Sequence, residues 1–130
     1  MAKLVIDACL DAALNYLKTN GTRMCICDSQ PTTYSLAVNT SVSSGYMLAA
    51  VSISSADFTG PADGGTSGRK ITINAQSSIS ITATGSAAHV AIVDVSSTAL
   101  LYVTTCTAQS LTATNKVNSP AWVIELRDPT

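Results

Sequence analysis

Charged side chains are scarce in this 130-residue chain, and neither sign dominates among them. Only 12% of the residues are charged, and 7 basic against 8 acidic residues give a formal net charge of −1. A protein that holds nucleic acid or an anionic lipid surface through its electrostatic field needs an excess of positive charge. We therefore expect neither nucleic acid nor a membrane as a partner.

Long hydrophobic runs are also missing, although 46% of the residues are hydrophobic. No uninterrupted apolar stretch approaches the roughly 18 residues that a membrane span requires. The apolar run at 4–6 ends at Asp7, and Asp11 follows, so we expect no signal peptide. Serine and threonine are abundant instead, with 17 of each. The composition predicts one compact domain over residues 1–130, with an uncharged polar surface suited to packing among other protein subunits.

The sequence also lacks the usual motifs of catalysis and of cofactor or metal binding. Its one histidine, His89, precedes Asp94 by five positions, which places the two on opposite faces of a strand. We expect His89 to form a hydrogen bond at the start of that strand. The glycine-rich stretch 60–68 matches no phosphate-binding pattern, and the aspartates are more simply turn formers than calcium ligands. We predict no catalytic, cofactor-binding or metal-binding residue and no enzyme.

Four cysteines stand at positions 9, 25, 27 and 106. Without a secretory signal they are expected to be free thiols, with Cys9 on the buried side of a helix. Cys25 and Cys27 are two residues apart and project from one face of a strand. If a disulfide forms after exposure to air, the expected bridge joins Cys25 or Cys27 to Cys106 on a neighbouring strand.

One amphipathic helix is predicted over residues 4–19. Its polar residues recur at steps of four, four and three and form one stripe: Asp7, Asp11, Asn15 and Lys18. The opposite face is apolar: Ile6, Leu10, Ala13, Leu14 and Leu17. Gly21 is expected to end the helix in a left-handed conformation. Such a helix needs an apolar surface to cover.

From residue 22 onward the apolar period changes from 3.6 to 2, which indicates strands. Eight segments are expected to be strands: 23–27, 34–38, 46–54, 69–75, 78–83, 87–93, 100–106 and 122–126. The nearly continuous apolar run in 87–93 is typical of a central strand covered on both faces. Trp122 is expected to be mostly buried in the strand that closes the core. The spacing predicts a mainly β domain over 22–130, a β-sandwich or jelly roll, attached to the N-terminal helix.

The segment 57–68 is predicted to be a long exposed loop that carries the only phenylalanine, Phe58. A lone aromatic ring beside cations suits insertion into a neighbouring subunit, so the predicted interface residues are Phe58, Asp63, Arg69 and Lys70. The alternative is that Phe58 folds back onto its own domain, because large apolar groups seldom stay exposed in a free protein.

Several segments resemble small structural proteins encoded in the head and tail modules of tailed bacteriophages and prophages. The segments that carry this resemblance are LDAALNYL (10–17), CICDSQPTTY (25–34), DFTGPADGGTSGRKITI (57–73), AHVAIVD (88–94), LLYV (100–103) and PAW (120–122). The resemblance extends over most of the chain. It implies a capsid decoration, or cement, protein with a β-sandwich or jelly-roll body, and it implies no catalytic residue.

The implied partners are the major capsid protein or other virion subunits, together with further copies of the chain as a homo-oligomer. The implied location is the virion, after synthesis in the bacterial host cytoplasm. One alternative is a tail- or fibre-associated virion protein whose long loops contact the host surface. A small enzyme is a further alternative, for which the sequence offers no site.

Overall fold

The computed structural model describes residues 4–40 and 46–129. It confirms a mainly β, sandwich-like domain with an amphipathic helix at its N-terminal end. Its elements are α1 (Asp7–Asn20), β1 (Arg23–Cys27), α2 (Tyr34–Val38), β2 (Met47–Ser52), the 3₁₀ turn η1 (Ser55–Asp57), β3 (Phe58–Asp63), β4 (Arg69–Ile73), β5 (Gln76–Ser80), β6 (Gly85–Asp94), β7 (Ala99–Leu111), β8 (Lys116–Ser119) and β9 (Trp122–Leu126).

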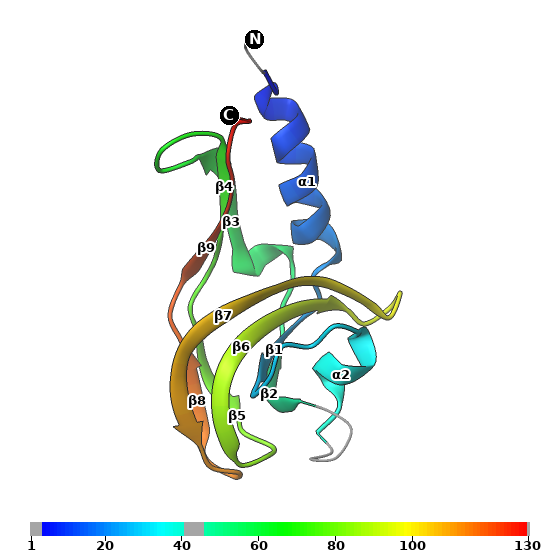
Figure 1. Ribbon diagram of the computed structural model, residues 1–130, viewed down its shortest axis with the longest axis vertical. Coiled ribbons are helices and arrows are strands. Elements are labelled where there is room, and N and C mark those ends of the chain that lie inside the picture. Colours follow the sequence, from blue (N-terminus) through cyan, green and yellow to red (C-terminus); the bar gives the residue numbers. More distant parts are fainter. Residues whose placement is uncertain (1–3, 41–45, 130) are drawn as a thin grey trace.

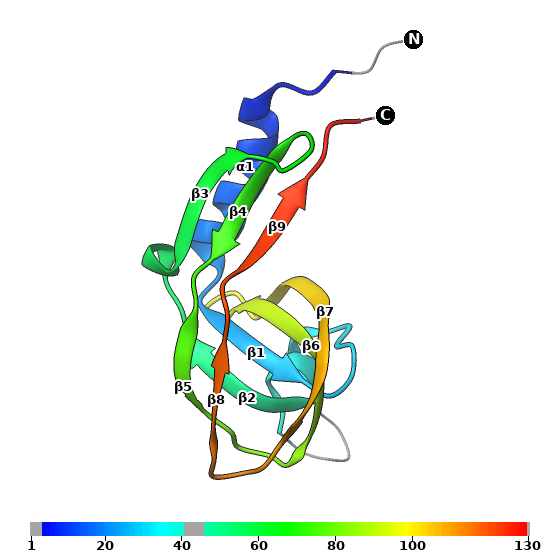
Figure 2. The same cartoon turned by 90° about the vertical axis from the view of Figure 1, so that its left-hand side faces the viewer.

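The strands form three antiparallel sheets, with orders β2-β1-β6-β7, β3-β4-β9 and β5-β8. The long, curved pair β6–β7 wraps around one half of the molecule, and α1 lies with β3, β4 and β9 in the other half (Figure 1). Figure 2 shows β5 and β8 on the viewer's side of β1 and β2. Because β6 lies between β1 and β7, the prediction of a central strand over 87–93 is confirmed.

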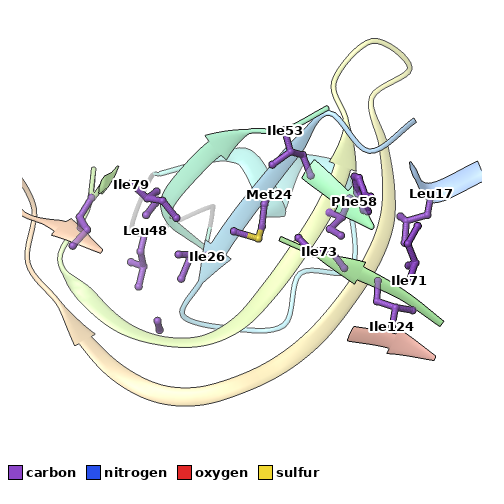
Figure 3. Close-up of a cluster of buried hydrophobic side chains, with 14 of the residues drawn as sticks. Leu17, Met24, Ile26, Leu48, Ile53, Phe58, Ile71, Ile73, Ile79 and Ile124 are labelled. Carbon is purple, nitrogen blue, oxygen red and sulfur yellow. The ribbon is translucent and has the colours of Figure 1, made fainter. Parts of the chain in front are cut away.

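One cluster of buried apolar side chains joins the two halves (Figure 3). Leu14 and Leu17 of α1 belong to it together with Met24 of β1, Ile71 of β4 and Ile124 of β9. Each large side chain of this kind contributes roughly 1.5–3 kcal/mol when it is fully removed from water. The helix is therefore held to the strands by the same core that holds the strands to each other.

The first residue of α1 and the side chains that the helix buries differ from the prediction. It begins at Asp7, and Ile6 precedes it in an extended conformation, so Ile6 remains 59% exposed. Leu14 and Leu17 are buried as predicted, but Ala13 and Cys9 are exposed. The reason is that α1 packs on β3 and β4 with part of its polar stripe, and not only with its apolar face.

The residue that ends α1, Gly21, also differs from the expected left-handed stop, since its φ is −71°. A Cβ at this position would lie 2.8 Å from the carbonyl oxygen of Leu17 and 2.9 Å from Cγ2 of Ile92. Glycine is therefore required by the close approach of α1 to β6.

The segment 34–38 was expected to be a strand and is the helix α2. The hydroxyl of Thr33 accepts a hydrogen bond from the Leu36 backbone N–H at 3.2 Å, which caps the helix N-terminus. Ala37 of α2 packs against a second buried cluster on the outer face of the four-stranded sheet: Cys25, Cys27, Ala91 and Val93. Both faces of β1 are therefore covered.

The predicted loop 57–68 is also corrected. Phe58–Asp63 forms β3, which pairs with β4 from Phe58↔Ile73 to Asp63↔Arg69. Only 64–68 remains as the connection. Strand β9 has the predicted bounds. Strand β7 extends to Leu111, beyond the predicted end at 106, and β8 was not predicted at all.

Candidate functional site

Phe58 does not project from the molecule. It is 4% exposed and belongs to the core cluster that includes Leu17 and Ile73 (Figure 3). The interface role of Phe58 was therefore wrong, and its alternative, packing in its own domain, is what the structure has. The cause is the pairing of β3 with β4, which fixes the ring inside the core.

Asp63 and Arg69 lie together at the end of the β3–β4 hairpin. The Arg69 guanidinium donates hydrogen bonds to Asp11 of α1, at 2.7 Å from Nε to Oδ1, and to the Asp63 carboxylate. The hydrogen bond to Asp11 is the main reason that the pKa of Arg69 is raised above its usual value. Arg69 thus joins the helix to the hairpin within one chain. Contact of Asp63, Arg69 or Lys70 with a partner stays a prediction.

Lys70 is the remaining predicted interface residue, and it is half-buried in β4. Its neighbours across the sheet are Ala62 of β3 and Glu125 of β9. Among residues 4–40 and 46–129 its ammonium group makes no ion pair. The structure therefore does not bring Lys70 into the Asp11–Arg69–Asp63 cluster.

A groove that the sequence did not predict lies between β7 and the β8–β9 segment. It consists of two neighbouring cavities of about 270 Å³ and about 330 Å³, which share Val90, Cys106, Ser119 and Pro120. We call this feature the β7–β8 groove. In Figure 2, β7 and β8 diverge from the turn that connects them.

The lining of the β7–β8 groove is apolar inside and polar at its mouth. Ile26, Ala87 and Leu111 are buried, whereas Thr107 and Gln109 are exposed. No charged residue lines either cavity. The groove can therefore hold an apolar group without removing an ion from water, while its mouth offers hydrogen-bonding groups.

Strand edges without a partner border the β7–β8 groove. Within the described chain β7 pairs only with β6, β8 only with β5 and β9 only with β4. An unpaired edge presents backbone N–H and C=O groups to any extended chain that approaches it. The combination of open edges and an apolar interior is the geometry that β-strand addition uses.

Trp122 lies at the β9 end of the groove. Its indole stacks on Tyr102, with ring centroids 6.1 Å apart, and the residue packs against the core but is only partly buried, whereas it was predicted to be mostly buried. Its Nε1 is buried and has no hydrogen-bond partner within the described chain. An indole N–H usually finds a partner when it is buried, so this unpaired donor is an exception within the described chain.

His89 does not fulfil the predicted role at a strand start. It lies within β6, paired with Cys27 of β1 and Thr105 of β7, and its Nδ1 is buried without a hydrogen-bond partner in the part of the chain that the structure describes. Asp94 does close a turn, since its carboxylate accepts hydrogen bonds from Ser96 and Ser97 after β6. These bonds, mainly the one from the Ser96 side chain, lower the pKa of Asp94.

All four cysteines are free in the structure. Burial raises the pKa of Cys25 to about 11 and that of Cys27 to about 12, and it also raises the pKa of Cys106. Cys106 lines the groove with Ile26, whereas Cys25 and Cys27 lie in the cluster under α2 on the other face of the sheet. The expected bridge to Cys106 was therefore wrong, because the thiols lie on opposite faces of the sheet.

Comparison of the chain with known proteins does not assign it to a family. Neither a protein-family model, nor a curated protein, nor a solved structure matches the chain significantly. Among residues 4–40 and 46–129, no group of three or more His, Cys, Asp or Glu side chains is placed to hold a metal ion. No helix in the same residues has the length and apolar character to cross a membrane.

The β7–β8 groove is thus the site that sequence reasoning missed. Leu111 and Val117, which flank the turn 112–115, are the signal that was available, because two apolar residues around a turn predict a pair of strands. That signal predicts a closed hairpin. The divergence of β7 from β8 depends on where β5 and β6 hold the two strands, which no local pattern contains.

Proposed function

We propose that the protein is a structural subunit of a tailed-bacteriophage particle, namely a capsid decoration protein that stabilises the head lattice through many protein contacts. The observation that supports this function best is the β7–β8 groove, an uncharged apolar slot bordered by open strand edges. Such a slot recognises polypeptide backbone and apolar side chains. The resemblance of the sequence segments to phage structural proteins supports the same proposal.

The surface chemistry fits a protein that binds a preformed lattice. With only 12% charged residues, contact between subunits removes few ions from water, and that removal is the main cost of burying a polar interface. Each contact of a decoration protein can then be modest, because many copies on one lattice convert weak contacts into strong attachment.

The alternative of a host-binding tail protein depends on long loops that contact the host surface. Where a loop was expected over 57–68, the structure has the paired strands β3 and β4 with a short connection at 64–68, which weakens this alternative. We therefore propose the decoration function and use the tail location as the contrasting outcome of its test.

The test is the copy number and position of the protein in purified particles. Quantitative mass spectrometry with isotope-labelled peptides would compare this chain with the major capsid protein, and immunogold electron microscopy would locate it. The proposal expects on the order of hundreds of copies spread over the head, as multivalent attachment to a lattice requires. A few copies at the tail, or none in the particle, would contradict it.

A further inference from the structure

The three residues before α1 form an exposed apolar segment, Leu4–Ile6, which we call the N-terminal arm. Leu4 is 86% exposed and Ile6 is 59% exposed. Ile6 is extended, with φ −74° and ψ 148°, and the arm contains no charge. Valine and isoleucine favour strands, so the arm is already suited to strand pairing. In Figure 2 the arm leads away from the body of the molecule.

The arm cannot reach the β7–β8 groove of its own chain. The 14-residue helix α1 is about 21 Å long at 1.5 Å per residue, and its C-terminal end is the one that meets Ile92 of β6. Buried Leu14 and Leu17 and the Asp11–Arg69 hydrogen bond fix the helix in place. Three extended residues span only about 10 Å, so the arm is left at the far end of the helix (Figure 1).

We propose that the N-terminal arm of one copy of this chain binds as an extended strand in the β7–β8 groove of a second copy. Arm and groove are complementary, since an uncharged apolar segment meets an uncharged slot with an apolar interior. In an extended strand Leu4 and Ile6 project to one side, towards Leu111 and Ile26, while Val5 projects to the other. The backbone of the arm pairs with the open edges of β7 or β8.

This contact links copies head to tail, because the arm and the groove are different surfaces. Each copy donates an arm to one neighbour and accepts an arm from another, so repetition produces a ring or an open chain. The inference goes beyond the decoration function, because it concerns association of the purified chain and requires no capsid.

The test is the oligomeric state of the full-length protein, measured by sedimentation velocity over a range of concentrations. The wild type is expected to associate. A double variant of the arm, Leu4→Asp with Ile6→Asp, and a variant at the groove mouth, Thr107→Arg, should each weaken association at least about 10-fold. Ala12→Asp on the exposed side of α1 and Thr112→Arg outside the groove are the matched controls and should associate like the wild type.

Mixing the two variants gives the sharpest result. The arm variant keeps an intact groove and the groove variant keeps an intact arm, so an equimolar mixture should form one contact and stop at a dimer. Thermal melting of each variant shows whether it is folded. A wild type that stays monomeric, an arm variant that associates normally, or a mixture that remains monomeric would each overturn the proposal. Loss of association in Ala12→Asp alone would assign the contact to the exposed face of α1 instead.

A disulfide trap tests the contact without relying on loss of binding. In a Cys9→Ser background, Leu4→Cys places a thiol on the arm, and oxidised glutathione accepts the two electrons when a bridge forms. Covalent oligomers, beginning with a dimer, in which this thiol is joined to Cys106 of the next copy are expected, because Cys106 lines the groove. A dimer bridged only between the two introduced thiols would overturn the assignment of the groove. Failure of these association tests would leave the particle location open, so the two proposals fail independently.

Discussion

Asp11 of α1 accepts two hydrogen bonds from Arg69 of β4, across 58 positions of sequence, at 2.7 Å and 3.3 Å. Arg69 also donates to Asp63, which faces it across the β3–β4 pair. One guanidinium therefore connects the helix, the edge strand and the central strand of the three-stranded sheet. The position of α1 depends on this polar connection as well as on Leu14 and Leu17.

Replacement of Asp11 by alanine should lower the melting temperature, because it removes the acceptor of two Arg69 hydrogen bonds in a partly buried place. The matched control is Asp7→Ala, which removes an acidic residue from the exposed first turn of the same helix. Differential scanning calorimetry should show a larger decrease in the melting temperature for Asp11→Ala than for Asp7→Ala. Equal decreases in the melting temperature would mean that Asp11 acts only through the helix dipole.

Phe58→Ala should destabilise the protein by about 3–5 kcal/mol, because it removes a buried aromatic ring and leaves a cavity in the main core. Urea unfolding of the variant and of Val123→Ala gives the comparison, since Val123 is exposed in β9. A free energy of unfolding that Phe58→Ala leaves unchanged would contradict the contribution of this ring to the core.

Sequence reasoning predicted the elements whose pattern is local. The alternation in Trp122–Leu126 and the apolar run ending at Asp94 identified β9 and β6, and the spacing of Leu14 and Leu17 identified α1. It missed β3, because Gly60 and Pro61 are turn residues, and only pairing with β4 makes that segment a strand. It missed the groove and the Asp11–Arg69 contact for the same reason, since both join residues that are distant in the chain.

The thiols should react with iodoacetamide in an order set by exposure. At pH 8 Cys9 should be modified first because it is exposed, and Cys106 more slowly because burial raises its pKa. Cys25 and Cys27 are fully buried under α2 and should react only after unfolding in urea. Peptide mapping by mass spectrometry reports each site. Modification of Cys25 in the folded protein at the rate of Cys9 would show that α2 does not cover it.

Alkaline pH should destabilise the protein through Cys25 and Cys27. Their pKa values rise on folding from 9.0 to about 11 and about 12, so the folded state favours the neutral thiols. The stability that this provides is complete below pH 9 and is lost as the pH rises towards 11–12, because the unfolded chain ionises first. Urea unfolding between pH 8 and 11 should show the decrease. The double variant Cys25→Ala with Cys27→Ala should have a lower free energy of unfolding at pH 8, and this free energy should decrease less between pH 8 and 11. An equal decrease in the variant and the wild type would contradict the assignment of the pH dependence to these two thiols.

Gly21→Ala should destabilise the contact between α1 and β6, although the backbone conformation at this position suits alanine. With φ at −71° the substitution brings no conformational strain, so any loss reports steric contact alone. The added Cβ would meet the Leu17 carbonyl oxygen at 2.8 Å and Ile92 Cγ2 at 2.9 Å, distances that force the helix or the strand to move. A loss of about 1–3 kcal/mol in urea unfolding is expected for such overpacking.

A second substitution separates the two contacts of Gly21. Ile92→Ala removes Cγ2, the atom that would meet the new methyl group, so the pair Gly21→Ala with Ile92→Ala should lose less stability than the sum of the single changes. Strict additivity would place the clash at the Leu17 carbonyl, where the helix must end differently. Full stability of Gly21→Ala alone would show that α1 can shift from β6 at no cost, and the position of the N-terminal arm would then no longer be fixed by the core.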